Sequence, residues 1–120
     1  MATNHRATIE AVNAAFSNNR LEDFIELCTE DVEMGEIGGK LTVGKDALRK
    51  SMQDDTWEAP VIGVTDILID GDRAVCHGIM DMDKKSGEKH RYAYVDIYTF
   101  RDEKIRKVQV HMKELKDGQA

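Results

Sequence analysis

Residues 91–100 constrain the fold more than any other stretch of this chain. Successive side chains of a β-strand point to opposite faces of a sheet, so the segment has two distinct faces. One face carries Tyr92, Tyr94, Asp96, Tyr98 and Phe100, and the other carries Ala93, Val95, Ile97 and Thr99. Asp96 is the only acid on the aromatic face. A carboxyl group buried there needs a dedicated partner or an altered pKa, so Asp96 is the first candidate functional residue.

The length and composition are typical of one globular domain, which we expect to span residues 1–120. Hydrophobic residues make up 41% of the chain and charged residues 33%. A net charge of −6 argues against a nucleic-acid partner, because phosphate binding requires a basic surface. No apolar run approaches the roughly 20 residues of a membrane span, and the first residues do not resemble a signal peptide. We therefore expect a cytoplasmic protein that binds neither nucleic acid nor membrane.

The cysteines and histidines do not form a metal-binding pattern. Cys28 falls at the end of an apolar helical stripe and Cys76 falls inside a predicted strand, so both are expected to be free buried thiols. The four histidines are scattered along the chain, without the paired spacing that metal ligands show. The sequence predicts no metal site and no cofactor.

The first half of the chain has helical periodicity. Apolar residues at helical spacing predict a first helix over residues 4–17. Asn19 is in position to cap a second helix, with Glu22 three residues later as in a capping box. A short strand is expected over residues 31–36, and a third helix over residues 44–52.

From Trp57 onward the period changes to two, which predicts strands. Besides residues 91–100, the predicted strands are residues 61–69, 74–83 and 105–115, joined by short turns. Helices at the front and an antiparallel meander at the back indicate an α+β domain. We expect the N-terminal helices to pack in the concave face of a strongly curved antiparallel sheet, a cone-shaped α+β barrel.

Residue parity predicts which sheet face lies inward. Matching the more apolar faces of the strands turns Asp96 and the tyrosines into the concavity. The side chains expected to contact a ligand there are Tyr94, Tyr98, Val12, Phe16, Met52, Trp57, Met80, Met82, Val110 and Met112. Trp57 could act as a lid or as a core anchor. The outer face offers Ile79, Val95 and Ile97, an apolar patch that suits a homodimer interface.

Three segments resemble the nuclear-transport-factor-2-like superfamily, most closely its SnoaL-like and ketosteroid isomerase branch. They are NNRLEDFIELCTEDVEMGEIGG (residues 18–39), GKDALRKSM (residues 44–52) and YVDIYTFRDEKIRKVQV (residues 94–110). The predicted order of elements agrees with that fold over nearly the whole chain. The fold hosts many functions, so the resemblance specifies architecture better than activity.

The resemblance also implies roles for particular residues. Glu36 falls where ketosteroid isomerases keep the carboxylate that shuttles the proton. Asp96 falls where they keep a protonated Asp that hydrogen-bonds the substrate's oxyanion. Val12 replaces the helix-one Tyr that completes this oxyanion site, and about Met52 replaces the Tyr that supports it. Tyr94 or Tyr98 would then have to supply the missing donor.

Two functions follow as hypotheses. In the first, the protein binds a small apolar or carbonyl-containing ligand and acts as an isomerase, cyclase or lyase, with Glu36 as base and Asp96 as hydrogen-bond donor. In the second, the same fold is a non-catalytic ligand-binding or dimerisation module. Asp96 could then be a structural carboxylate bound to a backbone amide or to Arg49, Arg91 or Arg101. Glu36 would be a solvated acid, and the tyrosines would be core residues.

Overall fold

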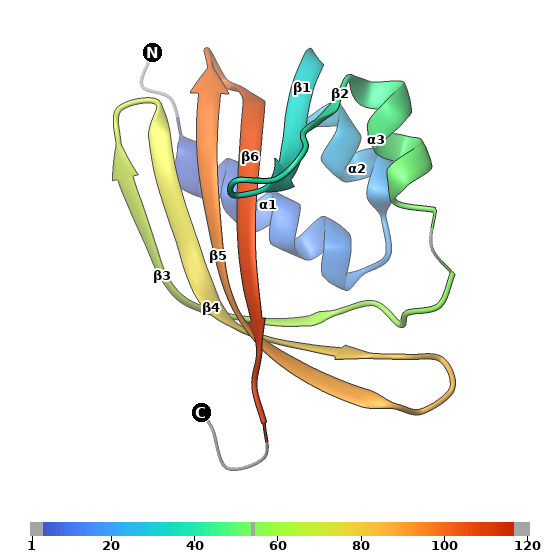
Figure 1. Cartoon of the computed structure of the whole chain (residues 1–120). Helices are drawn as coiled ribbons and strands as arrows, with labels where there is room; N and C mark the ends of the chain where they lie inside the picture. Colours follow the sequence, from blue (N-terminus) through green and yellow to red (C-terminus); the bar gives the residue numbers. More distant parts are fainter. Residues whose placement is uncertain (1–3, 54, 117–120) are drawn as a thin grey trace.

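The computed structural model describes residues 4–53 and 55–116, and within them it shows three helices and a six-stranded sheet (Figure 1). In chain order the elements are α1 (His5–Ser17), α2 (Leu21–Glu26), β1 (Cys28–Glu36), β2 (Thr42–Val43), α3 (Lys45–Ser51), β3 (Val61–Asp70), β4 (Arg73–Asp83), β5 (Lys89–Arg101) and β6 (Lys104–Glu114). The predicted α+β class is confirmed. The first strand is longer than expected because it begins at Cys28, which pairs with Ile105 of β6.

The strands form one sheet in the order β2-β1-β6-β5-β4-β3. Every neighbouring pair is antiparallel except β1 and β6, which run parallel. The sheet is curved but not closed, with β2 at one edge and β3 at the other. In Figure 1, α1 runs across the concave side of the sheet, while α2 and α3 lie beside β1 and β2.

The predicted cap of the second helix is wrong. Arg20, not Asn19, occupies the N-cap of α2, and no side chain caps that helix. Asn19 instead ends α1, with a φ of 56° that Asn tolerates better than most residues. The backbone N–H of Asn19 donates to Phe16 O at 3.2 Å, and that of Arg20 donates to Ala15 O at 2.8 Å. These two bonds form a Schellman motif, which uses Asn19 to stop the first helix.

A glycine pair bends the sheet between β3 and β4. The register of these strands shifts between Val64 and Asp66, which marks a bulge. A Cβ atom on Gly78 would lie 1.9 Å from Gly63 O, so the two backbones approach too closely for any side chain. Figure 1 shows β3, β4 and β5 sweeping beneath the helices after this bend. The curvature therefore depends on glycine at position 78.

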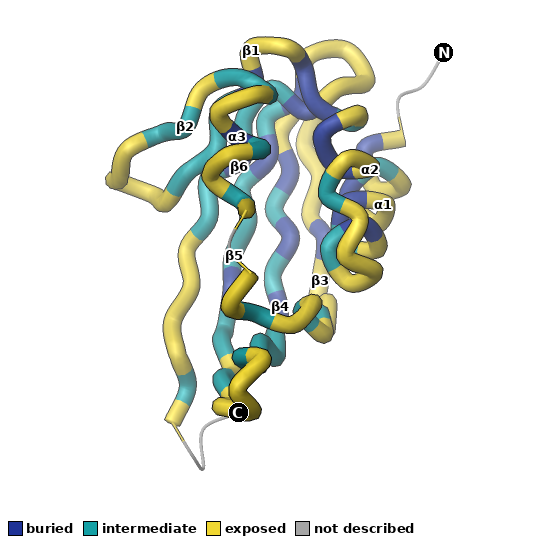
Figure 2. The backbone as a smooth tube through the Cα atoms, turned by 90° about the vertical axis from the view of Figure 1, so that its right-hand side faces the viewer, coloured by how far each residue is buried: buried dark blue, intermediate teal, exposed yellow. Residues whose placement is uncertain are grey.

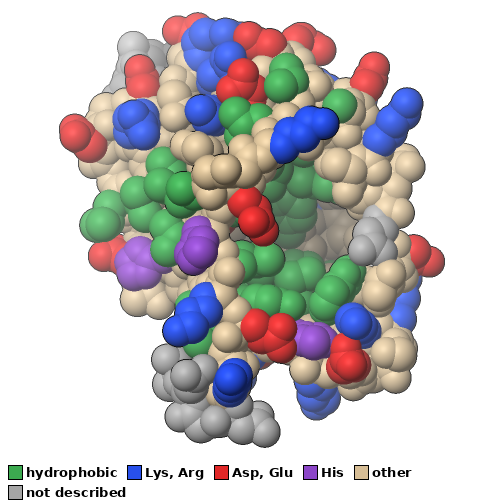
Figure 3. All heavy atoms as spheres, viewed as in Figure 1, with side chains coloured by type: hydrophobic (Ala, Val, Ile, Leu, Met, Phe, Trp, Pro, Cys, Tyr) green, Lys and Arg blue, Asp and Glu red, His purple; other side chains and the backbone are tan. Residues whose placement is uncertain are grey.

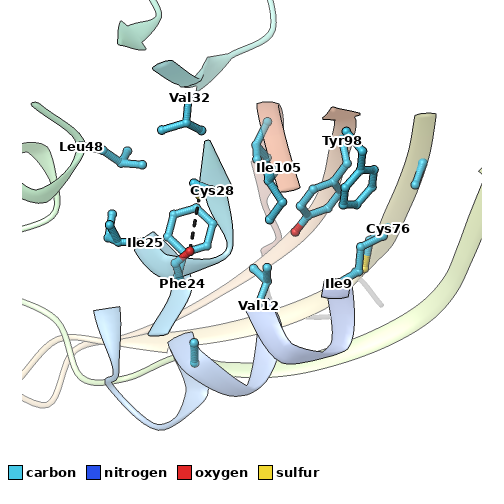
Figure 4. Packing of buried hydrophobic residues seen from close by; sticks show 14 of the residues in the cluster. Ile9, Val12, Phe24, Ile25, Cys28, Val32, Leu48, Cys76, Tyr98 and Ile105 are labelled. Atoms are coloured by element: carbon cyan, nitrogen blue, oxygen red, sulfur yellow. Dashed lines mark hydrogen bonds between the residues drawn. The ribbon is translucent and has the colours of Figure 1, made fainter. Parts of the chain in front are cut away.

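The hydrophobic core lies where the helices meet the sheet (Figures 2 and 4). Its buried residues come from every layer: Ile9, Val12, Ala15, Phe24, Ile25, Cys28, Val32, Leu48, Ile67, Ala74, Cys76, Tyr94, Tyr98, Phe100, Ile105 and Val108. Both thiols are free and buried, as predicted. His5 holds the start of α1 to the sheet, because its ring stacks on Phe100 at 3.8 Å and its Nε2 lies 3.1 Å from Asp72 Oδ1.

Candidate functional site

A cavity of about 380 Å³ lies between α1 and the concave face of the sheet. Its lining comes from all three helical regions and from five strands: Val12, Asn13, Phe16, Phe24, Met34, Met52, Pro60, Ile62, Met80, Met82, Tyr94, Asp96, Tyr98, Val108, Val110 and Met112. Figure 3 shows a recess with hydrophobic walls on this side of the molecule. The lining contains one carboxyl group and no Lys, Arg or His. An anionic ligand would therefore find no countercharge within it.

The strand register places Asp96 beside apolar residues of the neighbouring strands. Asp96 pairs with Cys76 on β4 and with Val110 on β6, so these three side chains share the inner face. Tyr98 pairs in the same way with Val108. The even-numbered side chains of β4 and β5 thus point into the concavity, as parity predicted, whereas beyond the bulge in β3 the pattern reverses: Ile67 is buried and Leu68 is exposed. Asp96 points into the concavity because side chains alternate between the two faces of a strand.

Asp96 has no hydrogen bond or ion pair to any other residue that the structure describes. The three arginines considered as structural partners are engaged elsewhere. Arg91 binds Asp81 at 2.7 Å, Arg101 binds Asp31 at 2.7 Å, and Arg49 binds Glu22 at 2.8 Å. Burial alone raises the pKa of the Asp96 carboxyl from 3.8 to about 7. Its protonation state therefore changes near neutral pH.

Tyr94 is a buried tyrosine whose hydroxyl has partners within the protein. Its hydroxyl donates to Gly63 O at 3.5 Å and lies 3.9 Å from Cys76 Sγ. The Nδ2 of Asn13 approaches the same sulfur at 3.8 Å from α1. Burial raises the pKa of both Tyr94 and Cys76. These groups form a weakly bonded polar cluster in the cavity wall beside Asp96, the strand partner of Cys76.

Tyr98 differs from Tyr94 in one respect. Only 1% of its surface is exposed, yet no described residue hydrogen-bonds to its hydroxyl. In Figure 4 its ring extends from β5 toward α1, with the hydroxyl end turned toward Val12. Burial, followed by the nearby charge of Asp96, raises its pKa well above the ordinary value. The hydroxyl is a hydrogen-bond donor without an acceptor among the described residues.

The structure does not bring Glu36 into the cavity with Asp96. Glu36 pairs with Val110 at the end of β1, but it is exposed and does not belong to the cavity lining. Trp57 also lies outside the lining. Its ring contacts His90 edge-on at 5.5 Å, and Lys84 Nζ lies 5.4 Å from the ring centroid. Trp57 borders a second cavity of about 280 Å³, which shares Phe16, Met34, Met52, Pro60 and Met82 with the first.

The other nine residues predicted as ligand contacts all line the cavity, and their contact with a ligand stays a prediction. Sequence reasoning missed six further lining residues: Asn13, Phe24, Met34, Pro60, Ile62 and Val108. A signal for Asn13 was available, because it lies four residues after Ile9, on the apolar face of α1. A polar residue within an apolar helical stripe is a candidate site residue.

The described residues contain neither a metal-binding cluster nor a membrane-spanning helix. No cluster of three or more His, Cys, Asp or Glu residues within 4–53 and 55–116 is arranged to hold a metal ion. No helix in those same ranges has the length and apolar character needed to cross a membrane.

The curved sheet, its covering helices and the apolar cavity define the architecture of the nuclear-transport-factor-2-like superfamily. The SnoaL-like domain family matches residues 9–108 of this chain. The protein belongs to that family. No curated protein matches the chain.

Solved structures agree on the fold at low sequence identity. A nuclear-transport-factor-2-like protein of unknown function from Burkholderia pseudomallei K96243 has a TM-score of 0.84 and 15% identity, covering 93% of this chain and 92% of its own. A Xanthomonas campestris pv. campestris protein, whose name proposes a polyketide cyclase, has a TM-score of 0.75 and 17% identity, covering 88% and 87%. TerC, co-crystallised with polyporic acid, has a TM-score of 0.77 and 19% identity, covering 89% of each chain.

Proposed function

We propose that this protein binds a small, largely apolar carbonyl compound in the cavity and that Asp96 moves a proton next to the carbonyl. One observation carries the proposal. Asp96 is a cavity-lining carboxyl without a hydrogen-bond or ion-pair partner among the described residues, and burial raises its pKa to about 7. A catalytic acid or base works best when its pKa lies near the operating pH. A surface carboxyl that served only solubility would not meet this condition.

The apolar walls fit the ligand class. Apart from Asn13, Asp96 and the hydroxyls of two tyrosines, the side chains of the lining are hydrocarbon or thioether. Such walls favour a ligand with a mostly hydrophobic body, and a few polar groups would set its orientation. The names of two structural neighbours, a proposed polyketide cyclase and a protein crystallised with polyporic acid, support a small organic ligand.

We assign the proton transfer to Asp96 alone and give Glu36 no role in it. Glu36 is exposed and lies outside the cavity lining. The same observation favours a second candidate function, a module that binds its ligand without converting it. In that case Asp96 would hydrogen-bond a polar group of the ligand, and no bond to hydrogen would break.

Hydrogen exchange into a model ketone separates these two functions. α-Tetralone has two fused rings and a carbonyl next to exchangeable hydrogens, so proton transfer would replace those hydrogens by deuterium in D₂O. We expect the wild-type protein to accelerate this exchange, measured by proton NMR, and Asp96→Asn to abolish the acceleration. Asp81→Asn is the control, because Asp81 pairs with Arg91 outside the cavity lining. Equal exchange by the wild type and Asp96→Asn would remove the catalytic role of Asp96.

We also propose that the outer sheet face joins two copies of this chain. Ile79, Val95 and Ile97 are half-buried there, and the neighbouring Leu68 on β3 is 56% exposed. Strand pairing aligns Leu68 with Val75 and Val75 with Ile97, which extends the apolar surface across three strands. Light scattering at micromolar concentration should give the mass of a dimer, and Ile97→Glu should give a monomer. A monomeric wild-type protein would contradict this assembly.

A further inference from the structure

We propose that the hydroxyl of Tyr98, and not that of Tyr94, donates the hydrogen bond that holds the ligand oxygen beside Asp96. The inference rests on the proposed function for the kind of ligand, a carbonyl compound in the cavity. It concerns a different residue and a different observation. The two tyrosines lie four residues apart on β5, and both line the cavity.

The first argument concerns the unused donor. Buried hydroxyl groups in folded proteins almost always have a hydrogen-bond partner, because removing them from water without one costs free energy. Tyr98 is 1% exposed, and its hydroxyl makes no hydrogen bond to a residue in the described part of the chain; because Thr29 Oγ1 is the one described side-chain nitrogen or oxygen atom that is fully buried without a partner, the small exposed area of Tyr98 includes its hydroxyl. Its hydroxyl end is turned toward Val12 of α1 (Figure 4), and both residues line the cavity. An oxygen atom of a bound ligand would supply the missing acceptor.

The second argument excludes Tyr94 as the donor. Its hydroxyl already donates to Gly63 O, at 3.5 Å, and Cys76 Sγ is a further neighbour at 3.9 Å. The glycine pair that bends the sheet brings Gly63 close to β4, where Gly78 is the strand partner of Tyr94. A ligand would have to break these contacts to recruit Tyr94. Recruiting Tyr98 breaks none.

The third argument is the spacing of Tyr98 and Asp96. They are two residues apart on one strand, so their side chains leave the same face with Cα atoms about 7 Å apart. Both side chains line the same cavity, and the charge of Asp96 adds to burial in raising the pKa of Tyr98. This separation leaves room for a carbonyl oxygen at Tyr98 and the adjacent carbon at Asp96.

The resulting proton transfer needs no further reagent. The Asp96 carboxylate takes a proton from the carbon next to the carbonyl, and the C–H electron pair forms a carbon–carbon double bond. The carbonyl π pair moves onto the oxygen, and the Tyr98 hydroxyl stabilises the negative charge that develops there. Return of the proton from Asp96 to this carbon, or to a conjugated one, restores the carbonyl. Asp96 then regains its starting state.

The experiment compares Tyr98→Phe with Tyr94→Phe. Each change removes one oxygen atom and keeps the ring, and the two positions share a strand and a face. We expect Tyr98→Phe to weaken α-tetralone binding, measured by calorimetry, about tenfold, as the loss of one hydrogen bond to a ligand does. Its melting temperature should stay level or rise, because the ring is kept and no hydrogen bond to a described residue is lost. Tyr94→Phe should keep the affinity and lower the melting temperature.

The outcomes separate this inference from the proposed function. If Tyr98→Phe binds the ketone as tightly as the wild type, or if it melts much lower, Tyr98 is a structural residue and the inference is overturned. If Tyr98→Phe weakens binding while neither it nor the wild type accelerates deuterium exchange, the inference stands and the catalytic proposal fails. Absence of ketone binding by the wild type overturns the inference whatever the melting temperatures are.

Discussion

The two faces of the sheet treat the same chemical group in opposite ways. On the outer side Asp81 of β4 is opposite Arg91 of β5, and hydrogen bonds from this guanidinium lower its pKa. On the inner side Asp96 of β5 is opposite Cys76 of β4, and burial raises its pKa to about 7. Both acids belong to the same pair of strands. Residue parity along the strand separates a stable anion from a group that titrates near neutral pH.

The difference shows how the protein keeps one carboxyl group reactive. An arginine across the strand fixes a carboxylate in its charged form, as at Asp81. The cavity lining on the inner face contains no Lys, Arg or His. No cation in this lining therefore stabilises the ionised form of Asp96, and only solvent or a ligand could do so. Three predictions test whether the separation of the two faces has these consequences.

The largest expected effect comes from disturbing the bend that makes one face concave. Gly78→Ala would place a Cβ atom 1.9 Å from Gly63 O and 2.9 Å from Thr65 N, which the backbone cannot accommodate without shifting. We expect the free energy of unfolding to fall by about 3 kcal/mol or more. Urea denaturation measures it. Gly39→Ala is the control, because its Cβ would meet nothing closer than 3.4 Å. Equal stability of the two variants would show that the bend does not require Gly78.

The next effect is the pH dependence of stability caused by Asp96. Because folding raises its pKa from 3.8 to about 7, the folded protein holds this proton more tightly than the unfolded chain. The free energy of unfolding therefore falls as pH rises from about 4 through about 7, by at most about 4 kcal/mol at 1.4 kcal/mol for each pKa unit.

Asp96→Asn should remove this loss. We expect it to be about 2–4 kcal/mol more stable than the wild type at about pH 8, and nearly equal to it at about pH 4. Thermal or urea unfolding at both pH values measures the difference. A variant less stable than the wild type at pH 8 would mean that Asp96 has a structural partner when ionised.

The smallest expected effect is the contribution of Asp81 to stability, which changes with pH in the opposite direction to that of Asp96. Folding lowers the pKa of Asp81, so its contribution to stability is present above its unfolded pKa and is lost as pH falls through its folded value. Asp81→Asn should therefore be slightly less stable than the wild type at neutral pH, and the difference should disappear in acid. The pair is exposed, so the loss should also shrink in high salt. A salt-independent loss would contradict an ion-pair origin.

Much of the fold was predictable because its signals are local. The period of the apolar residues separated helices from strands, and parity along residues 91–100 put Asp96 on the inner face. Features that depend on distant pairing were not predictable. The sequence near Cys28 does not reveal that β6 will extend the first strand by pairing with it. The predicted cap at Asn19 was wrong because Asn19 adopts a positive φ at the end of α1, and Arg20 takes the N-cap position of α2.

The candidate site was also predictable where its signals are local. Alternation along strands identified most of the cavity wall, since each strand has only two faces. It could not place Glu36, which lies at a strand end where exposure depends on how far the neighbouring elements reach. It could not place Trp57 in a connection without period, or distinguish Tyr94 from Tyr98. Their hydroxyls differ only because Gly63, on another strand, accepts one of them.

The parallel pairing of β1 with β6 also affects the order in which the protein can fold. Cys28 and Ile105 are strand partners that lie far apart in the sequence. Such contacts are slow to form because a long loop must close first. During synthesis the first two helices emerge long before the strands that cover their apolar side. They must remain without that cover, or be held by a chaperone, until the last hairpin leaves the ribosome.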